Sequence, residues 1–485
     1  MIRKWLARML LGRSVPVARV RARYDAAQTI GENQRHWQAA DGLSAVAANS
    51  PQVRRILRNR ARYEVANNSY ARGVTNTLAN DVVGTGPRLQ LMTMDSAANA
   101  LVERQFMDWS RAVNLASKLR TMHIARVQDG EGFAVLATNP RLDHPVQLDL
   151  RLIEADQVAS PMIGFDATSE TTNVDGIIVD RSGHPIEYLI LRDHPGSQSM
   201  TNAGSVADRV SAADVLHWFR VDRPGQVRGI PDITPALPLF AQLRRYTLAV
   251  LAAAETAADY AAVVYTDTPP GGEAEDYSQL PPEIQLENRL MTVLPGGWKL
   301  AQLKAEQPVT GYAEFKDAIL NEIGRCLNMP SNIVAGNSSG YNYASGRLDH
   351  QIYYRSIRIE QHQLGISILD RILSAWLDEA ALIPGFLPSS IGPFGRWEHR
   401  WFFDGTEHVD PLKESSAQAQ RLANHTTTLA DEYARQGLDW ETQLRQRARE
   451  MQLIRELGLH DDAVHIVEDS DDEDEYEYDE GLDDD

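Results

Sequence analysis

The sequence predicts an α+β protein in which long helices flank an antiparallel β-containing module. Residues 131–220 contain short β-rich runs separated by turn signals, whereas the segments on both sides repeat apolar residues at helical spacing. Hydrophobic residues make up 43% of the 485 residues, which is enough to build a core. No apolar run reaches the roughly 18 residues that a membrane-spanning helix needs.

In the N-terminal half, two helices are expected. The first spans 51–81 and is stopped by the glycines and the proline within 82–87, and the second spans 97–128. Leu101, Phe106 and Trp109 would form the apolar side of the second helix. Five β-rich runs follow, with the turn signal Ser182-Gly183 between two of them. The predicted strands are Phe133–Ala137, Leu148–Ile153, Gly176–Val179, Ile186–Leu191 and Val215–Phe219.

The C-terminal half is predicted to be mostly helical. An alanine-rich helix is expected at 235–262, then a Pro/Gly-rich segment with a strand at Met291–Leu294, and a helix at 312–328. A long helix at 346–380 has aliphatic residues every seven positions, which predicts one apolar side. These residues are Ile352, Ile359, Ile366 and Leu373. Shorter helices are expected at 411–424, 427–436 and 440–457.

The net charge of −19 is divided into three zones. Residues 1–62 hold 13 Lys/Arg and 3 Asp/Glu, residues 468–485 hold 13 acidic and no basic residues, and the part between carries −16. Arg8 and Arg13 interrupt the apolar stretch near the N-terminus, so we expect a basic amphipathic arm and not a signal peptide. The single cysteine, Cys326, excludes an intrachain disulfide framework and fits a reducing compartment.

Ten short segments carry a family resemblance through their order along the chain, since no single one is decisive. They are N-N-S-Y-A-R-G at 67–73, V-V-G-T-G at 82–86, L-I-E-A-D at 152–156, D-G-I-I-V-D-R-S-G-H-P-I-E-Y at 175–188, D-V-L-H-W-F at 214–219, R-P-G-Q-V-R-G-I-P at 223–231, L-P-G-G-W at 294–298, Y-A-S-G-R at 343–347, D-P-L-K-E at 410–414 and T-L-A-D-E-Y-A-R-Q-G-L-D-W-E at 428–441. Over roughly residues 20–458 the chain resembles the lambda-like portal proteins of tailed bacteriophages.

This resemblance implies a portal fold with long stem and wing helices, an antiparallel β-containing wing, a clip and an all-helical crown. It also implies a ring oligomer, usually a dodecamer. The implied parts are a basic arm (1–50), a first wing part (51–234), stem helices (235–262 and 312–329), a clip (263–311), a tunnel loop (330–345), a long helix with the second wing part (346–410), a crown (411–458) and an acidic disordered tail (459–485).

The resemblance further implies a non-enzymatic function at one capsid vertex of the virion, with assembly in the host cytoplasm. Double-stranded DNA would be packaged and ejected through the ring. The implied protein partners are the terminase large subunit, a head–tail adaptor or connector, the major capsid protein and the scaffold. The alternative is a DNA-binding structural head protein that forms no portal ring, which would bind DNA strongly and in a salt-sensitive way.

The expected DNA-channel residues follow from charge as well as from the resemblance. A body of charge −16 would repel the duplex and keep contacts with it transient, so we expect a mostly acidic or polar channel. Arg325 and Arg347 would be sparse positive points in it. The polar tunnel-loop residues expected to face DNA are Asn332, Asn337, Ser338, Ser339 and Asn342.

Enzymatic and metal-binding alternatives find little support in the sequence. Gly336–Gly340 matches G-x-S-x-G, but an esterase needs a strand before Ser338 and acidic and His partners after it, and a helix is expected before it. No phosphate-binding G-x-x-x-x-G-K-[ST] motif occurs, so the packaging ATPase is expected to be a separate partner. Cys/His spacing typical of zinc sites is also missing, and His350 and His362 are expected at the surface or an interface. We therefore expect no enzyme activity, metal or cofactor.

Three further features leave alternatives open. Cys326 is expected to be a small buried or interface residue, and Trp397 and Trp401 to pack in the core or to form a partner patch. The tail at 468–485 would be a solubilising segment, would repel packaged DNA near the crown, or would bind a basic partner during assembly.

Overall fold

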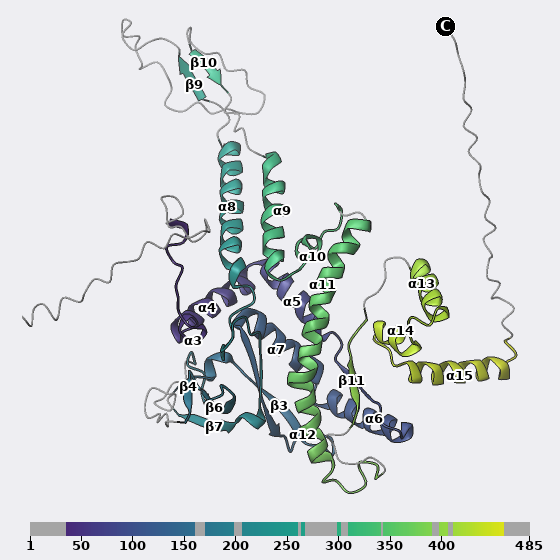
Figure 1. The fold of residues 1–485 in the computed structure, drawn as a ribbon. Helices are drawn as coiled ribbons and strands as arrows, with labels where there is room; N and C mark the ends of the chain where they lie inside the picture. Colours follow the sequence, from purple (N-terminus) through teal and green to yellow (C-terminus); the bar gives the residue numbers. More distant parts are fainter. Residues whose placement is uncertain are drawn as a thin grey trace, which may run out of the picture.

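The computed structural model describes residues 35–160, 170–197, 206–259, 263–266, 298–301, 309–340, 343–389, 397–405 and 411–459. An α+β body carries a projecting pair of helices, and three C-terminal helices lie at its side (Figure 1). This confirms the predicted mixture of helices and antiparallel sheets. Among the described helices, none is both long and apolar enough to cross a membrane.

The body begins with α3 (Ala45–Ala48), α4 (Pro51–Asn67) and α5 (Ser69–Val83), so the helical region expected at 51–81 is divided in two. The division falls at Asn68, whose extended backbone ends α4 and whose side chain accepts hydrogen bonds from the first amides of α5. Asparagine is a favoured N-cap residue, which explains why a new helix starts here.

The helix expected at 97–128 is also divided, into α6 (Ser96–Ala112) and α7 (Leu115–Asp129). Asn114 separates them with a left-handed backbone, φ 56°. Asparagine tolerates this conformation better than most residues, and the turn lets both helices bury aromatic and aliphatic side chains in the main core.

Two antiparallel sheets form the β module. The first has the order β3–β2–β8, and the second is a β4–β5–β6–β7 meander; residues of both sheets form a smaller second core. Their bounds are β2 (Glu131–Thr138), β3 (Leu148–Ile153), β4 (Thr172–Val174), β5 (Ile177–Val179), β6 (Pro185–Leu191), β7 (Ala207–Ser211) and β8 (Val215–Phe219), with single 3₁₀ turns at Ala155–Gln157, Ala212–Asp214 and Thr234–Ala236. All five predicted β runs are strands.

The projecting pair consists of α8 (Leu237–Asp259) and α9 (Val309–Cys326), close to the predicted helices at 235–262 and 312–328. The ring of Tyr246 in α8 lies 4.3 Å from that of Phe315 in α9, centroid to centroid. Beyond the tip, β9 (Val263–Thr266) pairs antiparallel with β10 (Trp298–Ala301). The strand predicted at Met291–Leu294 lies outside the described residues.

The long predicted helix is α11 (Tyr343–Leu364), a π-helical turn at Gly365–Leu369, and α12 (Asp370–Ala380). Its seven-residue apolar pattern does not form one buried side. Ile352, Ile359 and Ile366 are more than half exposed, whereas Leu373 is buried. A π turn inserts one residue and so rotates the following helix face by about 100°, which separates Leu373 from the isoleucines.

Two strands distant in sequence, β1 (Arg88–Leu91) and β11 (His399–Phe402), pair in a ribbon beside α6 and were not predicted. Trp401 in β11 packs on the main core beside Phe106, and Trp397 is partly buried against it, as expected for core packing. The ribbon joins the N-terminal helices to a segment about 300 residues later.

The last three helices are α13 (Pro411–Ala423), α14 (Leu429–Arg435) and α15 (Trp440–Glu456), which confirms the helices expected at 411–424, 427–436 and 440–457. The α15 N-cap, Asp439, accepts a hydrogen bond from Gln90 in β1. Gly405 and Gly437 approach so closely that a Cβ on Gly437 would lie 2.7 Å from the Gly405 nitrogen. The C-terminal helices therefore contact the body through the β1–β11 ribbon.

Candidate functional site

The residues expected to face DNA lie between the end of α9 and the start of α11. Arg325 is exposed on the last turn of α9, where its Nη1 donates to Asn328 Oδ1 at 3.2 Å. Arg347 is exposed in the first turns of α11. Asn342 lies outside the described residues.

Four of the predicted polar residues form one compact turn. The Asn332 amide nitrogen lies 3.3 Å from Ser338 Oγ and 3.1 Å from His350 Nε2. Asn337 donates its backbone N–H to the Asn332 carbonyl, and its side chain accepts from the backbone of Ser339. The structure thus brings together Asn332, Asn337, Ser338 and Ser339 and leaves the last three exposed.

The segment expected as a polar loop at 330–345 contains a short helix, α10 (Ser331–Ala335), which ends at left-handed Gly336. Val334 is buried and packs toward α9, because Gly324 has no side chain to keep it away. Only the part after Gly336 extends as a polar turn. The loop prediction was therefore wrong for Ser331–Ala335, whose apolar Ile333 and Val334 need a helix to pack in the core.

Ser338 does not have the surroundings of an esterase nucleophile. Helix α10 precedes it and helix α11 follows, whereas the nucleophile elbow requires a strand before the serine. The nearby His350 ring contacts the Asn332 amide, which lies between it and Ser338. The G-x-S-x-G match is a helix-to-helix turn.

The orientation of α11 is fixed by a second group of polar contacts. Glu360 accepts from Arg126 at 3.0 Å and lies 3.2 Å from His123 Nε2, both on α7. Burial alone would raise the pKa of Glu360, but the hydrogen bond from His123 and the charge of Arg126 lower it to about 2. Tyr353 adds a hydrogen bond to Asp81 on α5. These contacts determine which face of α11 points outward.

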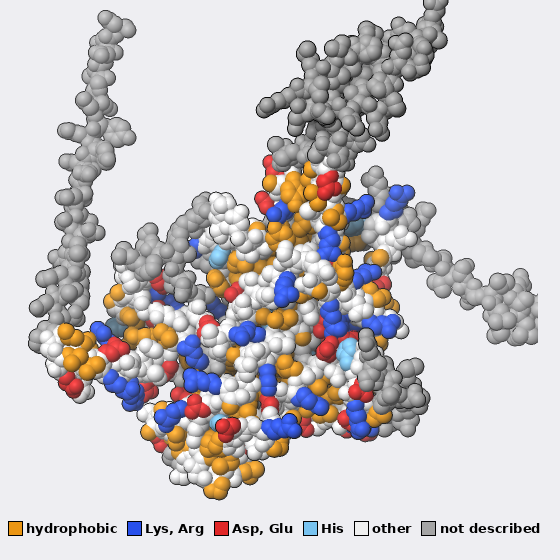
Figure 2. Space-filling view, turned by 180° about the vertical axis from the view of Figure 1, so that it is seen from behind, with side chains coloured by type: hydrophobic (Ala, Val, Ile, Leu, Met, Phe, Trp, Pro, Cys, Tyr) orange, Lys and Arg blue, Asp and Glu red, His pale blue; other side chains and the backbone are white. Residues whose placement is uncertain are grey.

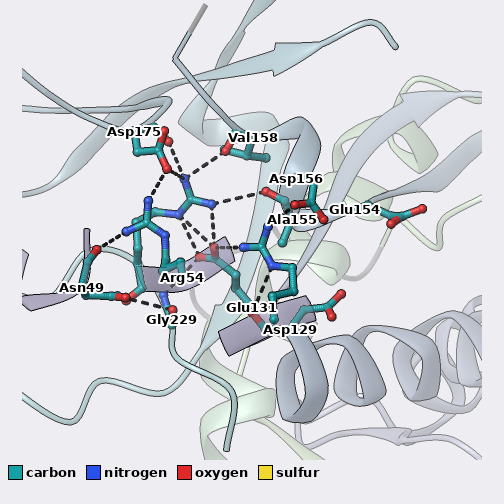
Figure 3. A network of polar contacts seen from close by, with 12 residues as sticks. Asn49, Arg54, Asp129, Glu131, Glu154, Ala155, Asp156, Val158, Asp175 and Gly229 are labelled. Atoms are coloured by element: carbon teal, nitrogen blue, oxygen red, sulfur yellow. Dashed lines mark hydrogen bonds and ion pairs between the residues drawn. The ribbon is translucent and has the colours of Figure 1, made fainter. Parts of the chain in front are cut away.

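A third cluster lies inside the body and was not singled out from the sequence (Figure 3). Arg54, Arg58 and Arg62 are spaced four residues apart on α4, which places them on one helix face. They meet the carboxylates and one further arginine from other elements. The carboxylates belong to Asp129, Glu131, Asp156 and Asp175, and the further arginine is Arg228, which pairs with Glu131. The four-residue spacing of these three arginines is the feature of the sequence that could have revealed this cluster.

Glu131, at the start of β2, is fully buried at the centre of this cluster. It accepts from Arg228 at 2.6 Å and from the Gly229 amide at 3.1 Å, and it lies 3.2 Å from His217 Nε2. Burial would raise the pKa of Glu131, but the charge of Arg228 and the hydrogen bonds from His217 and Arg228 hold it well below its usual value. Each carboxylate here has an arginine partner, so the cluster is a structural anchor.

Close backbone contact surrounds this anchor. Gly130 has φ +93°, and a Cβ on it would lie 2.7 Å from the Ile230 carbonyl carbon. A Cβ on Gly229 would lie 1.9 Å from the Gly130 oxygen. Only glycine permits this approach between the start of β2 and the segment at 223–231. Four segments of the resemblance series, 152–156, 175–188, 214–219 and 223–231, therefore meet at one place.

One trio of metal-ligand types lies beside the cluster. Ligand atoms of Glu154, Asp156 and His194 lie within 4.8 Å of one another. However, Asp156 pairs with Arg58 at 2.7 Å and with Arg62 at 2.9 Å, so arginines already balance its charge. The trio is part of an ion-pair network and gives no support for a metal site.

Cys326, at the end of α9, is half-buried, consistent with the expected small buried residue. Its thiol donates to the Ile323 carbonyl at 3.2 Å, and burial raises its pKa to about 11. A thiol with this pKa is a poor nucleophile near neutral pH.

Comparisons with known proteins agree with the family to which the ten segments pointed. The lambda family of phage portal proteins matches residues 31–361. A probable portal protein of Halomonas phage phiHAP-1 is 24% identical over 456 residues, which cover 86% of each chain.

Solved structures show a more distant similarity. A chain in the neck of a native gene transfer agent particle, computed with C12 symmetry, is 14% identical with a TM-score of 0.44, covering 80% of this chain and 94% of that one. An HK97 family phage portal protein from Corynebacterium diphtheriae is 11% identical with a TM-score of 0.30, covering 59% and 82%. Because the family match alone spans well over half of the sequence, this chain belongs to the lambda family of phage portal proteins.

Proposed function

We propose that this portal protein assembles into a ring, with twelve subunits as the expected number, at one vertex of the capsid. Double-stranded DNA would enter through the ring during packaging and leave through it during ejection. The observation that carries this proposal is the family match over residues 31–361, which includes most of the body, the projecting helices and most of α11.

The projecting helices support subunit association. Leu248 and Leu251 of α8 are 59% and 53% exposed, and Phe315 of α9 is 41% exposed. Figure 2 shows hydrophobic side chains over much of this projection. Small residues at Ala249 and Ala252 would let a neighbouring helix approach closely. A ring needs such lateral contacts between two different faces, because its interface is heterologous.

Passage of DNA is supported by charge and by the turn after α10. The body carries −16, which opposes tight binding of the duplex. Asn337, Ser338 and Ser339 project as exposed polar groups from an anchored helix and would contact DNA without strong ion pairing. Arg325 and Arg347 would add two isolated positive points.

We assign the remaining partners by the parts of the chain that would meet them. The clip at 263–311 would dock the terminase large subunit during packaging and the head–tail adaptor afterwards. The basic arm at 1–50 would contact the major capsid protein or the scaffold. The subunit would assemble in the host cytoplasm and remain in the virion as a structural component without catalytic function.

Electron-microscopic class averages of the purified full-length protein test the proposal. We expect rings with a central hole, and weak DNA binding in a filter or anisotropy assay. A monodisperse monomer under all conditions, with strong salt-sensitive DNA binding, would support the DNA-binding head protein instead.

A further inference from the structure

Helix α11 and the π turn that follows it present an apolar stripe to solvent. Leu348, Ile352, Ile359 and Ile366 are 64%, 54%, 55% and 59% exposed. Their spacing of four and seven residues places them on one helix face, opposite the face that Tyr353 and Glu360 hold against the body. A continuous stripe of large aliphatic side chains marks a contact surface, whereas single exposed residues do not.

The same face is basic. Arg347, Arg355, Arg358 and His362 are exposed along it, with Asp349 as the nearby carboxylate. A surface hollow of about 570 Å³ runs along this face, and its described lining residues are Gln351, Arg355, Arg358, Ile359 and His362. Within the described chain the three arginines make no ion pair, in contrast to the paired arginines of α4.

Helix α9 presents more acidic than basic groups to solvent. Glu314, Asp317 and Glu322 are exposed and, among the described residues, form no ion pair, whereas Arg325 in the last turn is the exposed cation beside them. The faces on α9 and α11 differ in sequence and charge, and only the short helix α10 separates the two helices along the chain (Figure 1). Each subunit therefore carries both halves of a complementary, heterologous contact.

We propose that the basic, isoleucine-bearing face of α11 receives the acidic face of α9 from a second copy of this chain. The proposal rests on the ring proposed above, which supplies the second copy. Carboxylates of α9 would pair with Arg355 and Arg358, and the isoleucines would be covered by the same helix. DNA explains the pattern less well, because phosphates would pair with the arginines but leave the aliphatic stripe exposed.

Charge reversal on one face and then on both tests the contact. The variants are Arg355→Glu/Arg358→Glu on α11, Asp317→Arg/Glu322→Arg on α9, and the fourfold combination in the full-length protein. We expect each double variant to lower the fraction of protein in rings at least tenfold, as measured by mass photometry and class averages. The fourfold variant restores the attraction with reversed sign, so its ring fraction should return to within about twofold of wild type.

Two controls make the outcomes separable. Ile359→Asp should also lose rings, whereas Leu382→Asp, an equally drastic change at an exposed residue after α12, should not. Circular dichroism melting of every variant excludes loss of the fold. Unchanged rings in the α11 variants, or reduced DNA binding with intact rings, would overturn the α11 contact. A folded fourfold variant that stays monomeric would overturn the pairing with α9, and a wild-type protein without rings would instead overturn the proposed function.

Discussion

Arg228 and Glu131 form a buried two-point ion pair, with Arg228 Nη2 2.6 Å from Oε1 and Nε 3.0 Å from each carboxylate oxygen of Glu131. The pair joins the segment at 223–231 to the first residue of β2. Both side chains are almost completely excluded from solvent, so neither charge has water as an alternative partner. The β module and α4 depend on this pair more than on the surface ion pairs.

Replacing one member of this pair should destabilise the fold strongly. In Arg228→Met the buried Glu131 carboxylate loses its main partner, and we expect the free energy of unfolding to fall by about 3–5 kcal/mol. Arg209→Met is the matched control, because Arg209 pairs with Glu187 at the surface and should contribute at most about 1 kcal/mol. Urea denaturation followed by circular dichroism measures both values. Equal losses in the two variants would contradict a special role for the buried pair.

The close approach of Gly229 to Gly130 makes a steric prediction. In Gly229→Ala the new methyl group would overlap backbone atoms on the facing segment, which cannot rotate away. We expect a loss of at least about 1–3 kcal/mol and lower soluble yield. Gly73→Ala, on an exposed face of α5 with nothing within 4 Å, should be neutral or gain up to about 1 kcal/mol. Thermal melting of both variants measures these changes in stability. A Gly229→Ala protein as stable as wild type would contradict the close approach of Gly229 to Gly130.

Glu103 predicts a pH dependence where the C-terminal helices meet the body. Its pKa is raised to about 7, mainly by burial and also by the charges of Asp439 and Glu441, although the hydrogen bond from the Leu91 N–H opposes this shift. The folded protein therefore holds this proton more tightly than the unfolded chain, and stability should fall as pH rises from about 4.5 to 7. Because the group is partly exposed, we expect a change of only about 1–2 kcal/mol.

Glu103→Gln removes this titration while keeping the shape of the side chain. Its melting temperature should therefore exceed that of wild type at pH 8 and approach it at pH 5. The matched control Glu187→Gln alters an exposed carboxylate and should not reproduce this difference. A constant offset between wild type and Glu103→Gln across this range would contradict the raised pKa.

Arg347 is expected to contact DNA as an isolated positive point. In a phage complementation assay, Arg347→Ala should reduce DNA retention or packaging, since one phosphate contact per subunit is lost around the ring. Arg181→Ala, exposed in the β meander, is the control and should have no effect. If Arg347→Ala leaves both retention and packaging unchanged, Arg347 has no role in the channel.

Local sequence patterns were sufficient for most elements. The five β runs, the α8–α9 pair and the three C-terminal helices follow from apolar periodicity, turn residues and caps, which act within a few residues. The division of the chain into a basic arm, an acidic body and an acidic tail is likewise a property of composition alone. The order of the ten short segments also pointed to the family. Recognising this order requires no knowledge of contacts between residues.

Contacts between residues distant in sequence determined the orientation of the helix faces and the buried ion-pair cluster. The π turn at Gly365–Leu369 rotates α12 relative to α11, so Leu373 is buried although the isoleucines of the same seven-residue pattern are exposed. Arg58 and Arg228 are far apart in sequence, and only packing brings both of them to the buried Glu131. Burial, charge pairing and helix phase depend on the whole fold, and so only the tertiary structure shows which residues anchor the body and which lie exposed on its surface.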